Sequence, residues 1–268
     1  MLNPLPVTQT FATDKDVRRA NLTFHFGAEL QGAVVRVCVI RGERILSLGS
    51  GVIATSAGRV LTAAHVLDLH KPGDLIAIGT YQSDEGSTRW EYYAIVLTPD
   101  QDLLEEDRNG RRVDYAVLAI RGRLELRPAE FCGYKTINYE TISIEPTPLT
   151  FDNFVGPAPP EAVQNLLGVE VLLCGYPSPL TTWTSISVSR GSICMVDDTG
   201  MLSVHAFIHG GSSGGPAFIR HEGTMYVAGI VSHNPAYQGE VINNLACIRS
   251  VHASCLRMLP QHYASVHA

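Results

Sequence analysis

The chain has 268 residues, of which 45% are hydrophobic and 17% are charged, and its formal net charge is −6. This composition excludes disordered and fibrous classes and predicts a globular protein with a proper core. The negative charge, without any long run of Lys or Arg, argues against a nucleic-acid partner.

The start of the chain differs from the rest. Residues 1–30 carry charge and little alternation, and we interpret them as an N-terminal extension with a short helix around residues 14–20. This segment lacks the apolar core of a signal peptide, and no later stretch approaches 18 apolar residues. We therefore expect a cytoplasmic protein with no membrane partner.

Short β-branched runs follow, such as AVVRVCVI at residues 33–40, and they are separated by Gly, Pro, Asp and Asn. This spacing predicts an all-β protein built from antiparallel barrels or a sandwich. The pattern weakens in a Pro-bearing stretch, which divides the chain into a first half at 31–125, a linker at 126–164 and a second half at 165–268.

The end of the second half has a different periodicity. Between residues 245 and 259 apolar residues recur at helical intervals, and Pro260 follows. This pattern predicts a C-terminal helix packed on the second half.

The six cysteines lie partly in apolar runs, which favours buried free thiols over disulfides. Cys247, His252 and Cys255 match no standard zinc spacing. We expect neither a metal nor an organic cofactor.

The sharpest chemical signal is the segment GGSSGGP at residues 210–216. Glycines on both sides of Ser213 allow backbone N–H groups to point at a developing oxyanion, and we assign that role to the N–H groups of Gly211 and Ser213. A glycine-rich hairpin is the structural alternative.

A hydroxyl nucleophile needs a base, and the base needs a group that orients it. His65 ends the small-residue run LTAAHV, and Asp114 begins the apolar run DYAVLAI. A carboxylate at the head of an apolar strand needs a hydrogen-bonding partner, which a histidine would supply. We predict Ser213 as nucleophile, His65 as general base and Asp114 as the carboxylate that orients it.

These segments resemble the trypsin-like (chymotrypsin-fold) serine peptidases, in which His, Asp and Ser motifs occur in this order. LTAAHV, VDYAVLAI and GSSGGP match the three motifs. The resemblance implies two antiparallel β-barrels and hydrolysis of a protein or peptide substrate. Val66 stands where digestive relatives have a half-cystine, and Ser212 stands where zymogen-activated relatives have an aspartate. Both features resemble the HtrA-like branch.

The resemblance also implies substrate-binding residues. Phe207 and Ile208 match the base of the primary specificity pocket, and no acidic residue is present there, so we expect a small or medium apolar residue before the scissile bond. Ser232, His233 and Asn234 match the strand that pairs with the substrate backbone, where His233 could favour an acidic or polar residue.

Two alternatives remain open from the sequence. One is a catalytically silent peptide-binding module, although all the triad motifs are present. The other is a latent protease that a partner or the N-terminal extension must activate.

Overall fold

The structure is a computed structural model. It describes residues 28–42, 44–84, 87–95, 114–124, 127–128, 137–138, 149–177, 186–197 and 200–251. The helix expected around residues 14–20 lies outside these ranges. Among the described residues, no helix is long and apolar enough to cross a membrane.

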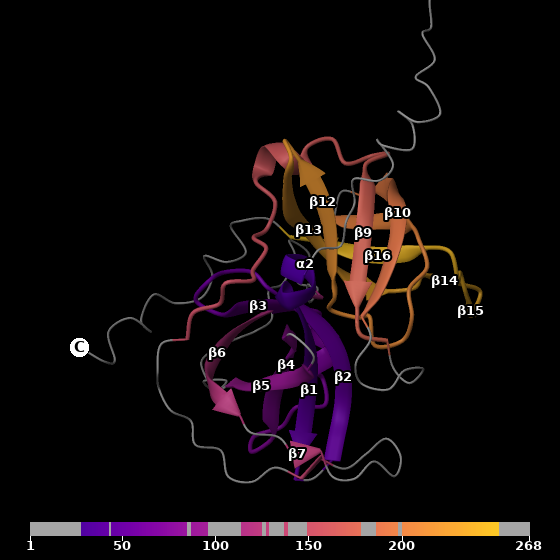
Figure 1. Cartoon of the computed structure of the whole chain (residues 1–268). Coiled ribbons are helices and arrows are strands. Elements are labelled where there is room, and N and C mark those ends of the chain that lie inside the picture. Colours follow the sequence, from indigo (N-terminus) through magenta and orange to yellow (C-terminus); the bar gives the residue numbers. More distant parts are fainter. Residues whose placement is uncertain are drawn as a thin grey trace, which may run out of the picture.

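The first half of the chain folds into an antiparallel β-barrel in the order β1-β2-β3-β6-β5-β4, and the pairing of β4 with β1 closes the ring (Figure 1). A short helix, α2 (Ala28–Ala33), leads into it. The strands are β1 (Val34–Arg41), β2 (Arg44–Ile53), β3 (Arg59–Thr62), β4 (Leu75–Asp84), β5 (Ser87–Ile95) and β6 (Ala116–Leu124).

The second half forms a separate antiparallel sheet in the order β10-β11-β16-β13-β12-β9, in which β9 also pairs with β10 (Figure 1). The strands are β9 (Glu170–Gly175), β10 (Ser187–Val196), β11 (Met201–His205), β12 (Pro216–His221), β13 (Thr224–His233) and β16 (Ala246–Ser250). The remaining elements are short: β7 (Arg127–Pro128), β8 (Ile137–Asn138), η1 (Ala64–Leu67), η2 (Pro160–Val163), β14 (Ala236–Tyr237) and β15 (Glu240–Val241).

The predicted all-β class is confirmed, because α2 is the only α-helix among the described residues. The predicted C-terminal helix is wrong where the structure tests it. Residues 246–250 form β16, which pairs with β11 on one side and β13 on the other. A short apolar run fits both helical and strand periods, and here strand pairing decides between them. Residues 252–259 lie outside the described ranges.

A continuous apolar cluster holds the two halves together. It contains the interior of the first barrel and also Leu172, Phe218 and Ile230 of the second half. Strand β1 shows why the cluster is continuous, because seven of its eight residues are buried and so both of its faces are covered. Phe218 is completely buried. The ends of strands from both halves therefore meet along a fixed boundary.

The four cysteines in the described residues are free thiols, and Cys38, Cys174 and Cys247 are buried while Cys194 is exposed. Burial raises the pKa of the Cys38 thiol to about 12. Burial also raises the pKa values of Cys174 and Cys247. At neutral pH these buried thiols are protonated and act as small apolar side chains.

Candidate active site

The pairing of two strands brings His65 and Asp114 together. Strands β3 and β6 are antiparallel, and Thr62 at the end of β3 pairs with Ala116 at the start of β6. The chain after β3 forms the short helix η1, which carries His65, while Asp114 lies just before β6. The barrel therefore places residues that are 49 positions apart in sequence side by side.

The imidazole of His65 is bonded to the carboxylate of Asp114. Its Nδ1 lies 2.9 Å from Oδ2 and 3.0 Å from Oδ1 of Asp114, and the His65 backbone N–H donates to Oδ1 at 3.0 Å. Because an ionised carboxylate only accepts, Nδ1 carries the proton and Nε2 is left as the basic nitrogen of the neutral ring. The His65 side chain is 41% exposed, so a substrate can reach it.

Asp114 is kept ionised by its neighbours. Burial alone would raise the pKa of this carboxyl. Hydrogen bonds from the His65 ring, the Ser232 hydroxyl and the His65 backbone N–H outweigh the burial and hold the pKa below the ordinary value of 3.8. The carboxylate therefore remains a negative acceptor for the imidazole throughout the neutral range.

Ser213 lies in the loop between β11 and β12, whose shape depends on glycines. The Ser212 N–H donates to the His209 carbonyl at 3.0 Å, and Gly211 has a φ of +87°. A four-residue turn with positive φ at its third position is of type II, a geometry that favours glycine. Gly214 also has a positive φ, of +83°.

Several backbone N–H groups of this loop, those of Gly211 and Ser213 among them, have no backbone acceptor in the described part of the chain. The N–H groups of Gly214 and Gly215, by contrast, donate to the carbonyls of Val231 and Ser212. Gly211 and Ser213 are the pair that the sequence predicted for an oxyanion.

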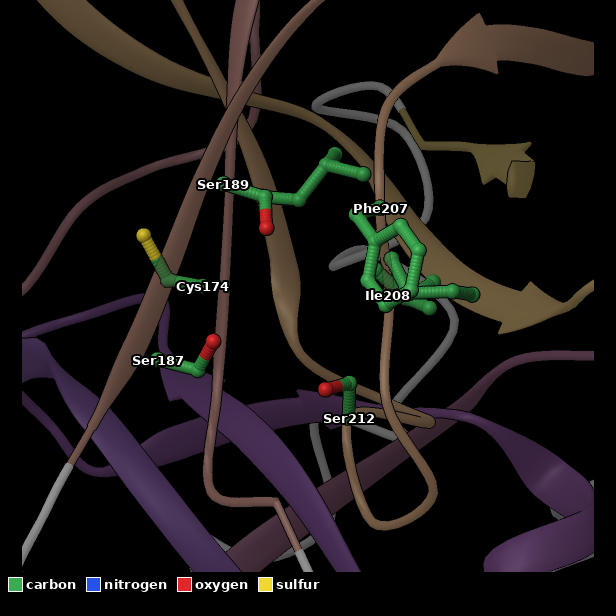
Figure 2. Close-up of a pocket in the computed structure, with 8 residues that line it drawn as sticks. Cys174, Ser187, Ser189, Phe207, Ile208 and Ser212 are labelled. Carbon is green, nitrogen blue, oxygen red and sulfur yellow. The ribbon is translucent and has the colours of Figure 1, made fainter. Parts of the chain in front are cut away.

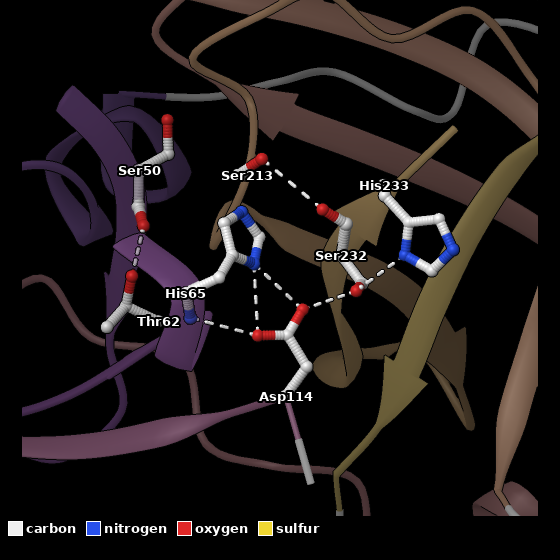
Figure 3. Close-up of polar contacts among 7 residues, drawn as sticks. All are labelled: Ser50, Thr62, His65, Asp114, Ser213, Ser232 and His233. Carbon is white, nitrogen blue, oxygen red and sulfur yellow. Dashed lines mark hydrogen bonds and ion pairs between the residues drawn. The ribbon is translucent and has the colours of Figure 1, made fainter. Parts of the chain in front are cut away.

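The ring of His65 lies between Asp114 and Ser213 (Figure 3). The Ser213 hydroxyl donates to the Ser232 carbonyl oxygen at 3.3 Å in this structure. Rotation about the Cα–Cβ bond would redirect the hydroxyl towards the ring. The three predicted residues thus meet at the boundary between the two halves of the chain.

Ser232 is a further member of the network, and the sequence predicted it only as a substrate contact. Its hydroxyl donates to Oδ2 of Asp114, and its oxygen also lies 2.9 Å from Nδ1 of His233. A hydroxyl has only one proton to donate, and Ser232 uses it in the hydrogen bond to Asp114. In the second bond His233 must therefore be the donor and the Ser232 oxygen the acceptor. The signal in the sequence was a serine in the apolar strand segment GIVS, because a buried hydroxyl needs a partner.

Replacing Ser232 with alanine should lower kcat about tenfold with little change in KM, because the loss of its hydrogen bond raises the pKa of Asp114 and loosens the His65 ring. The matched variant is His233→Asn, which keeps an N–H donor near the position of Nδ1 and should retain most activity. Steady-state kinetics on both variants tests this role, and an unchanged kcat in Ser232→Ala would contradict it.

The other predicted substrate-binding residues fall in two places. Phe207 and Ile208 line a narrow pocket next to the loop that carries Ser213 (Figure 2). Asn234 lies beyond β13, and its side-chain oxygen is buried without a hydrogen-bond partner in the described part of the chain. The remaining residues that line the pocket are Leu173, Cys174, Ser187, Ser189, Ser212 and Val231.

Within the described ranges, no group of three or more His, Cys, Asp or Glu side chains is arranged to hold a metal ion.

Comparisons with known proteins bear on the family and the fold of the chain. A family model described as "Trypsin-like peptidase domain" matches residues 49–230. The crystal structure of the serine endoprotease from Yersinia pestis is similar in fold, with a TM-score of 0.50 and 19% identity over 86% of this chain. The match covers 64% of that protein, less than two thirds of its length. A search of curated proteins finds no match. The chain belongs to the trypsin-like peptidase domain family.

Proposed function

We propose that the protein is a serine endopeptidase that cleaves a protein or peptide substrate through Ser213, His65 and Asp114. The observation that carries the proposal is the bonded pair of His65 and Asp114, with the ring next to the serine of a glycine-rich loop. Family membership supports peptidase chemistry in general terms.

In the proposed mechanism, Nε2 of His65 removes the hydroxyl proton as Ser213 attacks the peptide carbonyl. The N–H groups of Gly211 and Ser213 stabilise the oxyanion of the tetrahedral intermediate. His65 then gives its proton to the leaving amine, and an acyl-enzyme remains. Water activated by the same ring releases the acid and regenerates Ser213.

The pocket next to the loop supports an uncharged residue before the scissile bond. Its walls are apolar side chains, including Phe207, Ile208 and Val231, together with serine hydroxyls. None of the described residues that line it carries a charged side chain. A Lys, Arg, Asp or Glu of the substrate would lose water there without gaining an opposite charge.

The first test is intact mass spectrometry after treatment with a fluorophosphonate, which phosphonylates an activated serine. We expect one adduct on the wild type and on Ser192→Ala, an exposed serine on β10 outside the proposed mechanism. We expect no adduct on Ser213→Ala or His65→Ala, and casein hydrolysis should be lost in the same two variants, by about 10⁶-fold for Ser213. A wild type that gains no adduct would contradict the proposal of an active peptidase and favour a latent protease or a peptide-binding role.

A further inference from the structure

We propose that Ser50 is a positioning residue that fixes the two oxyanion donors relative to each other. This inference rests on the proposed function, because it assigns a task to Ser50 in stabilising the same oxyanion. Ser50 belongs to β2 of the first barrel, whereas the donors belong to a loop of the second half.

Every polar atom of Ser50 is engaged in a hydrogen bond. Its N–H donates to the Ser213 carbonyl at 2.7 Å, and its hydroxyl donates to the Gly211 carbonyl at 2.8 Å. The same hydroxyl accepts the Tyr176 N–H at 2.8 Å. The Ser50 carbonyl accepts the Thr62 hydroxyl at 2.7 Å, as Figure 3 shows. Ser50 is completely buried. It is thus a rigid junction of β2, the loop and the end of β9.

The two loop residues that Ser50 holds are the two whose N–H groups the mechanism requires. The bonds reach their carbonyl oxygens, so they leave the N–H groups free for a substrate. Gly211 lacks a Cβ and can adopt many conformations at low cost, and therefore its own sequence does not fix its position. The bond from the Ser50 hydroxyl supplies that restraint.

Loss of the Ser50 hydroxyl should weaken stabilisation of the transition state more than it weakens substrate binding. Removing one oxyanion donor from a serine protease costs about 10²- to 10³-fold in kcat. Ser50→Ala leaves both donors in the chain but loosens one, so we expect a smaller loss, about 10- to 100-fold in acylation. The type II turn itself should persist, because the positive φ of Gly211 does not depend on Ser50.

The test compares diethyl 4-nitrophenyl phosphate with the corresponding phosphorothioate. In both, Ser213 Oγ forms a bond to phosphorus, 4-nitrophenolate leaves, and His65 takes the hydroxyl proton. The oxygen of P=O accepts hydrogen bonds from the oxyanion donors, whereas the sulfur of P=S accepts them poorly. The ratio of the two rates therefore reports on the oxyanion donors, and a general loss of stability would not change it.

We expect Ser50→Ala to lower this oxo-to-thio ratio about tenfold or more. Ser50→Cys, which keeps the side-chain size and a weak donor, should give an intermediate ratio and guards against failure of the alanine variant to fold. The matched control is Thr80→Val, which also removes a buried hydroxyl from the first barrel but lies on β4, where it pairs with Glu91 rather than with Ser50 or the loop. It should keep the wild-type ratio.

Two negative outcomes have different meanings. If the wild type reacts and folded Ser50→Ala keeps its ratio, the role of Ser50 is overturned and the proposed function stands. If the wild type does not release 4-nitrophenolate, the proposed function itself is contradicted.

Discussion

Replacing Asp114 with asparagine is expected to lower kcat/KM for peptide hydrolysis about 10⁴-fold, the size found when the acid of such a triad becomes an amide. The carboxylate accepts from three donors: the His65 N–H, the His65 ring and the Ser232 hydroxyl. An amide has one acceptor oxygen and an NH₂ group that must face one of these donors. Facing the ring, it would move the histidine proton to Nε2, which could then no longer accept the proton of Ser213.

The matched variant is Asp74→Asn. Asp74 also accepts several hydrogen bonds, from Arg41 at 2.7 Å and from the Lys71 N–H at 2.8 Å, and the Arg41 guanidinium lowers its pKa to about 2. None of the hydrogen bonds described for Asp74 involves His65. The kcat/KM of Asp74→Asn should therefore match that of the wild type. Steady-state kinetics and ¹⁵N NMR of the His65 ring provide the measurements. An Asp114→Asn enzyme that retains wild-type kcat/KM would contradict the role of Asp114.

The effect of Asp114→Asn on stability should depend on pH. The folded-state pKa of Asp114 lies below its ordinary value of 3.8, so the ionised carboxylate stabilises the fold above pH 3.8. That contribution disappears as the pH falls through the folded-state pKa. The difference in unfolding free energy between wild type and Asp114→Asn should therefore be largest near neutral pH and shrink below pH 3.8. Urea denaturation at pH 7 and pH 3 tests the sign.

His65, Asp114 and Ser213 could be proposed as a triad from the sequence because each motif is local. LTAAHV, DYAVLAI and GGSSGGP each combine a reactive side chain with the small or apolar residues that its own segment needs. The meeting of His65 and Asp114 then follows from one antiparallel pair, β3 with β6. The contact could be proposed from the sequence because Asp114 needs a hydrogen-bond donor and His65 needs a group that orients its ring.

The link from Asp114 to Ser232 could not be predicted in this way. Ser232 lies on β13 of the second half, so its contact with Asp114 depends on how the two halves pack. The sequence marked Ser232 and His233 as substrate contacts, and it contained no sign that both belong to a hydrogen-bonded chain ending at Asp114. The hydrogen bond from Ser50 to Gly211 could not be predicted for the same reason. The two residues are 161 positions apart and belong to different halves of the chain.

The wrong prediction of a C-terminal helix has a different cause, which is the ambiguity of a short local pattern. The segment LACIRSVHASC has apolar residues that satisfy a helical period. However, Ala246 and Ile248 also satisfy the period of two that suits a strand, and both are completely buried in the core of the second half. Periodicity over so few residues does not separate the two states, and open edges of β11 and β13 were available for pairing.

The second large effect is expected from Gly214→Ala, which should lower kcat/KM by at least about 10³-fold. A Cβ on Gly214 would overlap the Ser50 carbonyl oxygen and the Thr62 hydroxyl. Neither atom can move freely, because Thr62 and Ser50 are themselves hydrogen-bonded in the first barrel. The loop would have to shift instead, and both Ser213 and its N–H group would leave their positions.

The matched control separates this close approach from backbone strain. Gly223, in the turn between β12 and β13, has the same φ of +83°, but nothing lies within 4 Å of its Cβ position. Gly223→Ala should cost about 1–2 kcal/mol of conformational strain and keep wild-type activity. Thermal unfolding and kcat/KM on both variants give the comparison. Equal activity in the two alanine variants would show that the nucleophile loop tolerates a shift, and the tight contact between the loop and the first barrel would then not be required for catalysis.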